Sequence, residues 1–491
     1  MYNYILLIYH KKPWRFKRVK YNMYNDKGEG DMKRKITGML IASALACSLL
    51  AGCQKTAPSG DTGTQAGGTT AAGTAAQTSG TDKDAVKVRI LTRFSNPDSV
   101  REKYFMDMVA KFQEENPDIL LEDVSISDEE SHDTLFKTSV AAGDPIEVFN
   151  FLGYAANLDY VKNGVLADLS GLMDEDPAWT EDYIDALFAP VDYSDYGVEG
   201  IYGIPNAPYG VCCFYNKAVF DKLNMELPET WEEIEKAAPI LIDNGYIPMT
   251  FGAKDNYRAG HFLTALSMKY YGDQLKTDLI NGDTAWNSPE TVALIDMMQK
   301  WYDEGIFGSN NLAYDANGEL AKLESGEAAI IFSGSWNIAT VNEFENASDI
   351  VCKGFPYFES KPEFKDEWMG GPDDFMSMTA KPGDDNYEAS VRVLKFFTSQ
   401  EYWQGLYEVQ QGGGTFPVKF DETIEADPLT TEFNEYYSRA TNMIGEIEQF
   451  SPMTSLLDTV RTEVTTIFAG DSASDIADRI QAEVEAYDAM Q

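Results

Sequence analysis

From Val86 onward, short apolar runs alternate with longer stretches in which apolar residues recur every three or four positions. The first pattern predicts buried strands and the second predicts amphipathic helices. In the helical stretch 99–117, Phe105 and Phe112 fall on one face, and a proline ends the pattern. The predicted order is strand 86–92, helix 99–117, strand 118–126, helix 132–143 and strand 145–152. Such a βαβαβ order predicts a parallel sheet covered by helices.

The rest of the chain repeats this alternation. Thr230 and Glu233 have the spacing of a capping box at the start of a helix that Gly245 ends. Further predicted elements are a helix at 288–305, a buried strand at 326–337 and a long amphipathic helix at 387–410. With 491 residues, the chain is too long for one small core, and the pattern predicts two α/β lobes.

The segment "MKRKITGMLIASALACSLLAGCQK", which begins at Met32, has the pattern of an export signal. A basic triplet precedes an apolar run that is shorter than a membrane span. The closing tetrapeptide LAGC resembles the bacterial lipobox, whose cysteine is diacylated and becomes the new N-terminus. We therefore expect a lipoprotein signal peptide at 32–52 and lipidation, including palmitate, at Cys53. The alternatives are a plain secretory peptide and a short membrane anchor.

Residues 1–31 do not fit such a signal, so we expect Met32 to be the true start and 1–31 to be an upstream extension. Residues 54–84 contain no aromatic or large aliphatic side chain. That composition predicts a flexible tether over 53–85, because it cannot form a core. A lipidated cysteine followed by a tether predicts a protein anchored to the extracytoplasmic face of a bacterial cell membrane, on a Gram-positive surface.

The net charge of −41 argues against binding to nucleic acid, since an acidic surface repels a phosphate backbone. The chain has three histidines and lacks the H-E-x-x-H, C-x-x-C, P-loop and G-x-S-x-G patterns. We therefore expect no metal, no cofactor and no enzymatic activity. A glycoside hydrolase, which needs two carboxylates at a fixed separation, remains an alternative.

Two adjacent cysteines, Cys212 and Cys213, lie in the apolar run "GIYGIPNAPYGVCCFYNK", and Cys352 is the only other cysteine that follows Cys53 in the sequence. Three cysteines with one adjacent pair make a poor disulfide framework. Small buried side chains in a strand are therefore favoured over a redox or metal site.

Four segments resemble, in order, the carbohydrate-type solute-binding proteins of ABC importers, the family that includes maltose-binding protein. They are "AAGDPIEVF", "GIYGIPNAPYGVCCFYNKAVFDKLNMELPETWEE", "LESGEAAIIFSGSWN" and "SVRVLKFFTSQEYWQ". The second is the most specific of the four. The resemblance covers the chain from Val86 to its end.

This resemblance implies an α/β, two-lobed, periplasmic-binding-protein-like (type II) fold with an interlobe hinge and a ligand cleft. The implied first lobe is 86–207 plus 354–381, and the second is 208–353 plus 382–491. The chain would cross between them in the 200–217 stretch, near 352–356 and near 381–384.

The function implied by the family is that of an extracellular receptor. It would bind a carbohydrate in the cleft and deliver it to the transmembrane permease subunits of an ABC importer, most simply as a monomer. A receptor for a polyamine or a glycerol phosphate is the alternative within this class of protein.

Sugar binding needs aromatic rings for the C–H face of a pyranose and carboxylates or amides for its hydroxyls. Trp336 matches the family's stacking tryptophan. Asn96, Glu147 and Asn150 are placed by the predicted strands at strand ends, where open α/β sheets bind ligands. The remaining candidates for ligand contact are Tyr154, Tyr209, Trp286, Trp368, Gly371 and Asp373.

Each candidate has a structural alternative: core packing for the tryptophans, helix capping for the polar residues, hinge packing for Tyr209 and a plain turn for 367–375. For Trp286 a structural role is favoured over ligand contact, because the residue precedes a helix cap. Leu456 and Leu457 stand where some relatives have a bulky aromatic residue. The ligand is therefore expected to be smaller than a maltodextrin or to be held elsewhere.

Overall fold

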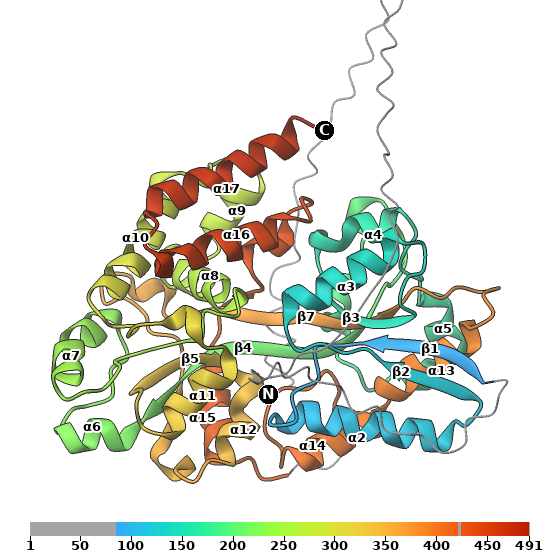
Figure 1. Ribbon diagram of the computed structural model, residues 1–491, viewed down its shortest axis with the longest axis horizontal. Coiled ribbons are helices and arrows are strands. Elements are labelled where there is room, and N and C mark those ends of the chain that lie inside the picture. Colours follow the sequence, from blue (N-terminus) through green and yellow to red (C-terminus); the bar gives the residue numbers. More distant parts are fainter. Residues whose placement is uncertain (1–84, 421–423, 491) are drawn as a thin grey trace, which may run out of the picture. The chain divides into compact units, whose positions relative to one another are not determined.

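The computed structural model describes residues 85–420 and 424–490, except for the side chains of Asp195, Ala207 and Asp373 (Figure 1). The predicted upstream extension 1–31, signal peptide 32–52 and tether, with Cys53, lie outside the described residues. Within the described ranges, no helix has both the length and the apolar character needed to cross a bilayer.

A parallel three-stranded arrangement opens the chain, as the alternating pattern predicts. Strand β1 (Val86–Leu91) pairs with β2 (Ile119–Asp123) on one side and with β3 (Val148–Leu152) on the other. Helices α2 (Val100–Glu115) and α3 (Glu129–Ala141) make the two crossovers. The side chain of Ser99 accepts the first-turn amide of Glu102 and caps α2. The predicted βαβαβ order is confirmed.

Two long antiparallel strands, β4 (Ile204–Asn216) and β7 (Glu367–Met378), continue this sheet into the second half of the molecule. The strand order is β2-β1-β3-β7-β4-β5, with β6 (Ile350–Lys353) on β4 and β8 (Asn442–Ile444) on β7. Strand β5 covers Ile330–Gly334. Residues 204–210 of β4 pair with β7, whereas 211–216 pair with β5 and β6.

The crossing in the 200–217 stretch therefore lies within a continuous strand. A second crossing lies in β7, because its first residues pair with β8 and its last ones with β3. The crossing predicted near 352–356 lies instead in β7, and the one predicted near 381–384 lies instead between Val418 in a first-lobe cluster and Leu429 in a second-lobe cluster. Gly370 in β7 has a φ of +157°, and a Cβ there would lie 2.5 Å from the carbonyl oxygen of Tyr209. Glycine lets the two crossing strands approach this closely.

The remaining helices cover the sheet on both faces (Figure 1). They are α4 (Leu158–Lys162), α5 (Ser170–Glu175), α6 (Lys217–Leu223), α7 (Trp231–Asp243), α8 (Tyr257–Tyr271), α9 (Gln274–Ile280), α10 (Pro289–Asp303), α11 (Ala316–Glu324), α12 (Ile338–Asn342), α13 (Tyr387–Phe397), α14 (Gln400–Val409), α15 (Pro428–Tyr437), α16 (Leu456–Thr465) and α17 (Ala473–Asp488). Among the short 3₁₀ turns, η1 covers Ala155–Asn157, η6 Ser335–Asn337, η8 Pro362–Phe364 and η9 Ile447–Phe450. The predicted capping box of Thr230 and Glu233 is present at α7.

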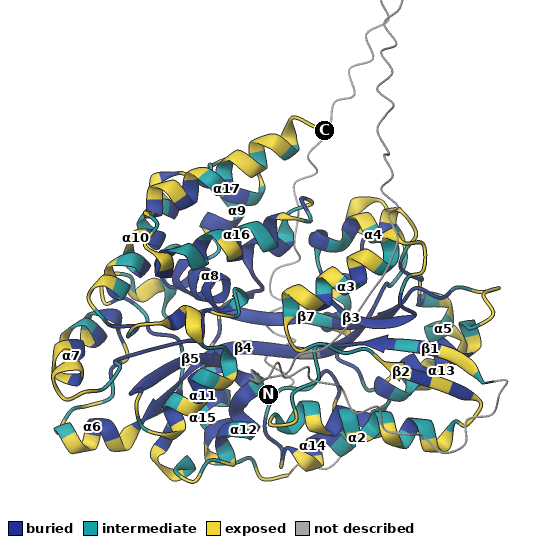
Figure 2. Cartoon of the chain, in the orientation of Figure 1, coloured by how far each residue is buried: buried dark blue, intermediate teal, exposed yellow. Residues whose placement is uncertain are grey.

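The buried apolar residues form separate clusters on the two sides of the crossings, which defines two lobes. Strands β3 and β5 are buried almost throughout, whereas the edge strand β2 is partly exposed and the helices expose their outer faces (Figure 2). Cys212 and Cys213 are both fully buried in β4 and belong to different clusters, because successive side chains point to opposite faces of a strand. With Cys352 they are free cysteines that fill the core of the second lobe.

The lobe boundaries differ from the expected ones in two places. Helices α13 and α14 join the first-lobe core, in which the indole Nε1 of Trp403 donates to the hydroxyl of Tyr183 at 2.7 Å. The second lobe therefore does not contain all of 382–491. Conversely, Phe355 packs on Trp231 in the second lobe, with ring centroids 5.6 Å apart, although 354–381 was assigned to the first. An amphipathic pattern predicts burial of a face but not the surface that covers it.

Candidate ligand-binding site

Four rings from three segments meet beside the crossing in β4. The ring centroid of His261 on α8 lies 5.9 Å from that of Tyr209 on β4, with only 22° between the planes. Trp336, in the η6 turn after β5, lies 5.9 Å from both Tyr209 and His261. Tyr257, one helical turn before His261, completes the group at 5.1 Å. We call these four residues the aromatic cluster; the sequence pointed to Tyr209 and Trp336.

A buried ion pair lies next to the aromatic cluster. Arg258 and Glu319 are both fully buried, and their side chains meet at 2.8 Å. The guanidinium carbon of Arg258 lies 5.8 Å from the ring centroid of Trp336 and 5.4 Å from that of Tyr257. A cation held over a ring face attracts the π-electrons, so this pair helps to fix both rings.

A second buried ionic group joins the two lobes. Arg461 of α16 binds the carboxylate of Glu446 through Nε at 3.0 and 3.1 Å, and its Nη1 binds Glu129 of α3 at 2.7 Å. Burial by itself would raise the pKa of Glu129. The charges of Arg461 and Arg93 and the hydrogen bond from Arg461 outweigh it and lower that pKa to about 2. Glu129 is therefore ionised at any pH near neutrality.

Asp374 of β7 is the centre of a polar group on the first-lobe side. Its Oδ1 binds Nη2 of Arg93 at 2.5 Å and accepts from Nδ2 of Asn150 at 3.1 Å, while its Oδ2 accepts from Nδ2 of Asn206. Asn150 is fully buried, and its Oδ1 has no partner among the described residues. The sequence pointed to Asn150 and to the neighbouring Asp373, whose side chain lies outside the description.

Two other predicted residues contact the opposite lobe. Asn96 donates from Nδ2 to Oδ1 of Asn317, at the start of α11, at 2.9 Å. The ring of Tyr154 lies 4.5 Å from that of Phe450. The backbone of Tyr154 has a φ of +67°, which a non-glycine residue adopts only when its surroundings enforce it. Such backbone strain is typical of ligand-binding segments.

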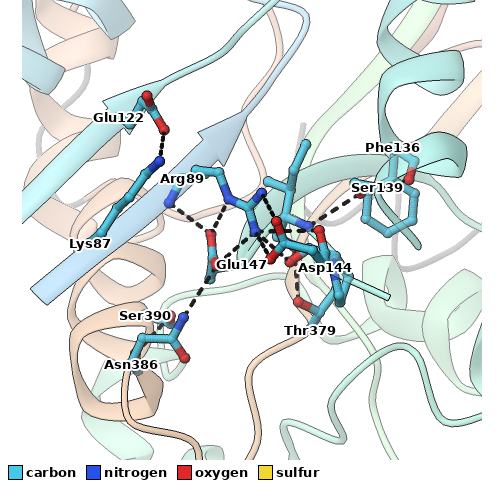
Figure 3. Close-up of polar contacts among 12 residues, drawn as sticks. Lys87, Arg89, Glu122, Phe136, Ser139, Asp144, Glu147, Thr379, Asn386 and Ser390 are labelled. Atoms are coloured by element: carbon cyan, nitrogen blue, oxygen red, sulfur yellow. Dashed lines mark hydrogen bonds and ion pairs between the residues drawn. The ribbon is translucent and has the colours of Figure 1, made fainter. Parts of the chain in front are cut away.

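Glu147 lies elsewhere, and its predicted position at the end of a strand is wrong. Strand β3 begins after it, so Glu147 stands at the amino end, away from the edge where parallel strands bind ligands. Its carboxylate binds Arg89 of β1 through Nε and Nη2, both at 2.9 Å, and accepts from Asn386 at 3.2 Å (Figure 3). Asp144 binds the same guanidinium. This group connects β1, β3 and the start of α13.

Three more candidates also lie apart from the aromatic cluster or lack the expected exposure. Trp286 is 3% exposed within the main second-lobe core. Trp368 is 3% exposed, and its ring packs between Phe433, Tyr436 and Tyr437. Gly371 lies next to the cluster but is paired with Tyr209 inside the sheet, because 367–378 is a strand and not the expected loop.

A family model for bacterial extracellular solute-binding proteins matches residues 96–359. The chain belongs to this family. It is 23% identical to the multiple sugar-binding protein of Streptococcus mutans serotype c over 368 residues, which are 71% of this chain and 80% of the relative. The family resemblance seen in the sequence is confirmed.

Solved structures confirm the two-lobed, type II periplasmic-binding-protein-like fold. One is a chitin oligosaccharide binding protein, with a TM-score of 0.72, 20% identity, and coverage of 82% of this chain and 99% of the other. Another is maltose-bound MalE3 of T. maritima, with a TM-score of 0.64, 20% identity, and coverage of 82% and 100%.

The site of this solute-binding protein includes residues that its sequence did not single out. His261, Glu446 and Arg461 are buried, and their partners are far away along the chain. The spacing of Tyr257 and His261, four residues apart on one helix face, was the only available signal. In the described part of the chain, no group of three or more His, Cys, Asp or Glu side chains is arranged to hold a metal ion.

Proposed function

We propose that this solute-binding protein captures a carbohydrate between its lobes and delivers it to an ABC permease. The aromatic cluster carries the proposal, because stacked rings beside buried polar groups suit the apolar face and hydroxyl rim of a pyranose. The similarity to a multiple sugar-binding protein, a chitin oligosaccharide binding protein and a maltose-bound protein supports it.

The charges favour a neutral ligand over a phosphate. Arg93, Arg258 and Arg461 are each bound to a carboxylate of the protein, so their charges are already neutralised. A phosphate would have to compete with those carboxylates. A receptor for glycerol phosphate is therefore less favoured than one for a sugar.

The mechanism that we propose is closure without chemistry. Ligand contacts to both lobes shift the population toward the closed arrangement, which the permease recognises.

We further propose that a lipid on Cys53 holds the receptor at the outer face of the membrane. Changing Cys53 to Ser should release the protein from the membrane fraction into the medium, which immunoblotting of cell fractions measures.

The ligand proposal is tested by thermal unfolding of the purified protein with mono- and oligosaccharides, polyamines and glycerol phosphates. A ligand that binds only the native state raises the unfolding temperature. We expect a rise of several degrees with one class of sugar, and Trp336→Ala should abolish it. Trp286→Phe, in the core, is the matched control and should keep the response.

A rise with a polyamine or a phosphate alone would keep the fold and contradict the carbohydrate assignment. Consumption of the sugar during incubation would contradict a receptor role. Chromatography of the sugar before and after incubation detects that second outcome.

A further inference from the structure

His261 occupies a special place within the aromatic cluster. It lies in the second turn of α8, is 8% exposed and has Tyr209, Tyr257 and Trp336 around its ring. The preceding residue is glycine. A Cβ on Gly260 would lie 2.6 Å from Oε1 of Glu446, so α8 is pressed closely against this carboxylate.

The imidazole is neutral. Burial lowers the pKa of His261 well below 6.5, and the charges of Arg461 and Arg258 lower it further, while Glu129 opposes them. The titratable groups around the ring are those of Tyr209 on β4, Tyr257 and Arg258 on α8, Arg461 on α16, Glu129 on α3 and Glu446 after β8. A neutral imidazole has one nitrogen that donates and one that accepts.

The neighbouring carboxylate decides which nitrogen carries the proton. Nε2 of His261 lies 3.7 Å from Oε2 of Glu446, which is too long for a hydrogen bond but attracts a proton to that side of the ring. Burial raises the pKa of Glu446, whereas the charge of Arg461 and its hydrogen bonds to both carboxylate oxygens favour the ionised form. Nδ1 is then the acceptor. It is buried and has no hydrogen-bond partner among the described residues.

We propose that Nδ1 of His261 accepts a hydrogen bond from a hydroxyl group of the bound carbohydrate and thereby makes that free hydroxyl a requirement for binding. The inference rests on the proposed function and adds a specificity-determining residue to it. A buried acceptor without a donor is costly, and in the proposed function the sugar binds at the rings that surround this nitrogen.

The consequence is discrimination between close analogues. A ligand that lacks this hydroxyl, or carries a methyl ether there, leaves Nδ1 unsatisfied and loses about 10- to 100-fold in affinity. A carboxylate or phosphate oxygen at the same place would face a lone pair and be rejected. A site that contacted only the C–H face of the sugar would bind all these analogues with similar affinity.

The experiment measures dissociation constants by titration calorimetry for the sugar found in the thermal screen and for its monodeoxy analogues. His261→Phe keeps an aromatic ring but removes the acceptor. His261→Asn places an amide oxygen near the position of Nδ1. Trp286→Phe is the control for a change of a buried aromatic residue outside the cluster.

We expect the unaltered protein to reject at least one monodeoxy analogue by about 10-fold or more. His261→Phe should bind the parent sugar correspondingly more weakly. It should bind that analogue with the same affinity as the parent sugar. His261→Asn should recover part of the discrimination. The ligand-free Phe variant should unfold at the same temperature or a higher one, because an unsatisfied acceptor is gone; a purely structural role would lower both stability and affinity.

Full affinity of His261→Phe for the parent sugar, with discrimination intact, would overturn this inference and leave the proposed function standing. Failure of the unaltered protein to bind any carbohydrate would overturn both.

Discussion

At the scale of single residues, Glu446 and Glu448 show how position sets the behaviour of a carboxyl group. Both are fully buried, two residues apart. Glu446 is bound by the guanidinium of Arg461. Neither oxygen of Glu448 has a hydrogen-bond partner among the described residues, and burial followed by the charge of Glu446 raises its pKa to about 8.

The raised pKa of Glu448 predicts a pH-dependent stability. Between about pH 4.5 and 8 the folded protein holds a proton that the unfolded chain has lost, so this group makes stability fall as pH rises through that window. Glu448→Gln should therefore raise the unfolding temperature by about 3 °C or more at pH 8 and change it little at pH 5. Calorimetric scans at both pH values measure the difference.

Glu446→Gln is the control for that substitution. It removes a charged partner from Arg461 and should lower stability by about 3 kcal/mol at neutral pH. Equal effects of the two substitutions on stability would contradict the raised pKa of Glu448. A gain in stability from Glu448→Gln that does not grow with pH would contradict it as well.

At the scale of elements, α8 is the helix on which the site depends most. It supplies Tyr257, Arg258 and His261, and it packs closely on the Arg461 side chain. A Cβ on Gly260 would lie 2.7 Å from Cγ of Arg461 as well as 2.6 Å from Glu446. The glycine therefore permits a helix–helix approach that brings two ionic groups and four rings together.

Gly260→Ala should lower stability by about 1–3 kcal/mol, although alanine favours a helix by about 1 kcal/mol, because the methyl group meets atoms held by the ion pair. Gly171→Ala in α5, where a Cβ meets nothing within 4 Å, should leave stability unchanged or raise it slightly. Urea unfolding of both variants measures the contrast. A gain from Gly260→Ala would show that α8 can move away from α16.

At the scale of the whole molecule, the contacts between the lobes include a pair of facing helices with complementary charges. Glu129 and Lys137 of α3 meet Arg461 and Asp458 of α16, at 2.7 and 2.8 Å respectively. Each pair joins segments more than 300 residues apart in sequence. If ligand binding closes the lobes, these pairs stabilise the closed arrangement.

Lys137→Glu should speed ligand release up to about fivefold, because like charges then face each other across the lobes. Adding Asp458→Lys should restore the original rate, and 500 mM salt should reduce the difference. Lys111→Glu is the control, since Lys111 binds Glu401 within the first lobe at 2.9 Å. Stopped-flow fluorescence measures release; no effect of Lys137→Glu would remove α3 and α16 from the closing surface.

The sequence by itself determined the local structure and the family. Periodicity and caps predicted the first crossovers and α7, and the motif around Trp336 predicted an aromatic site residue. These features depend on neighbours a few positions apart, which the chain presents directly. The lobe assignment of 382–491 failed because an amphipathic face does not specify its partner.

Only the tertiary structure decided which charges and rings meet. The sequence predicted a ligand contact for Glu147, whereas the fold pairs its carboxylate with Arg89. The sequence did not single out His261, which the fold surrounds with Tyr209, Trp336 and Glu446. A pKa or an unsatisfied acceptor is set by atoms within a few ångströms, and here most of those atoms come from distant parts of the chain.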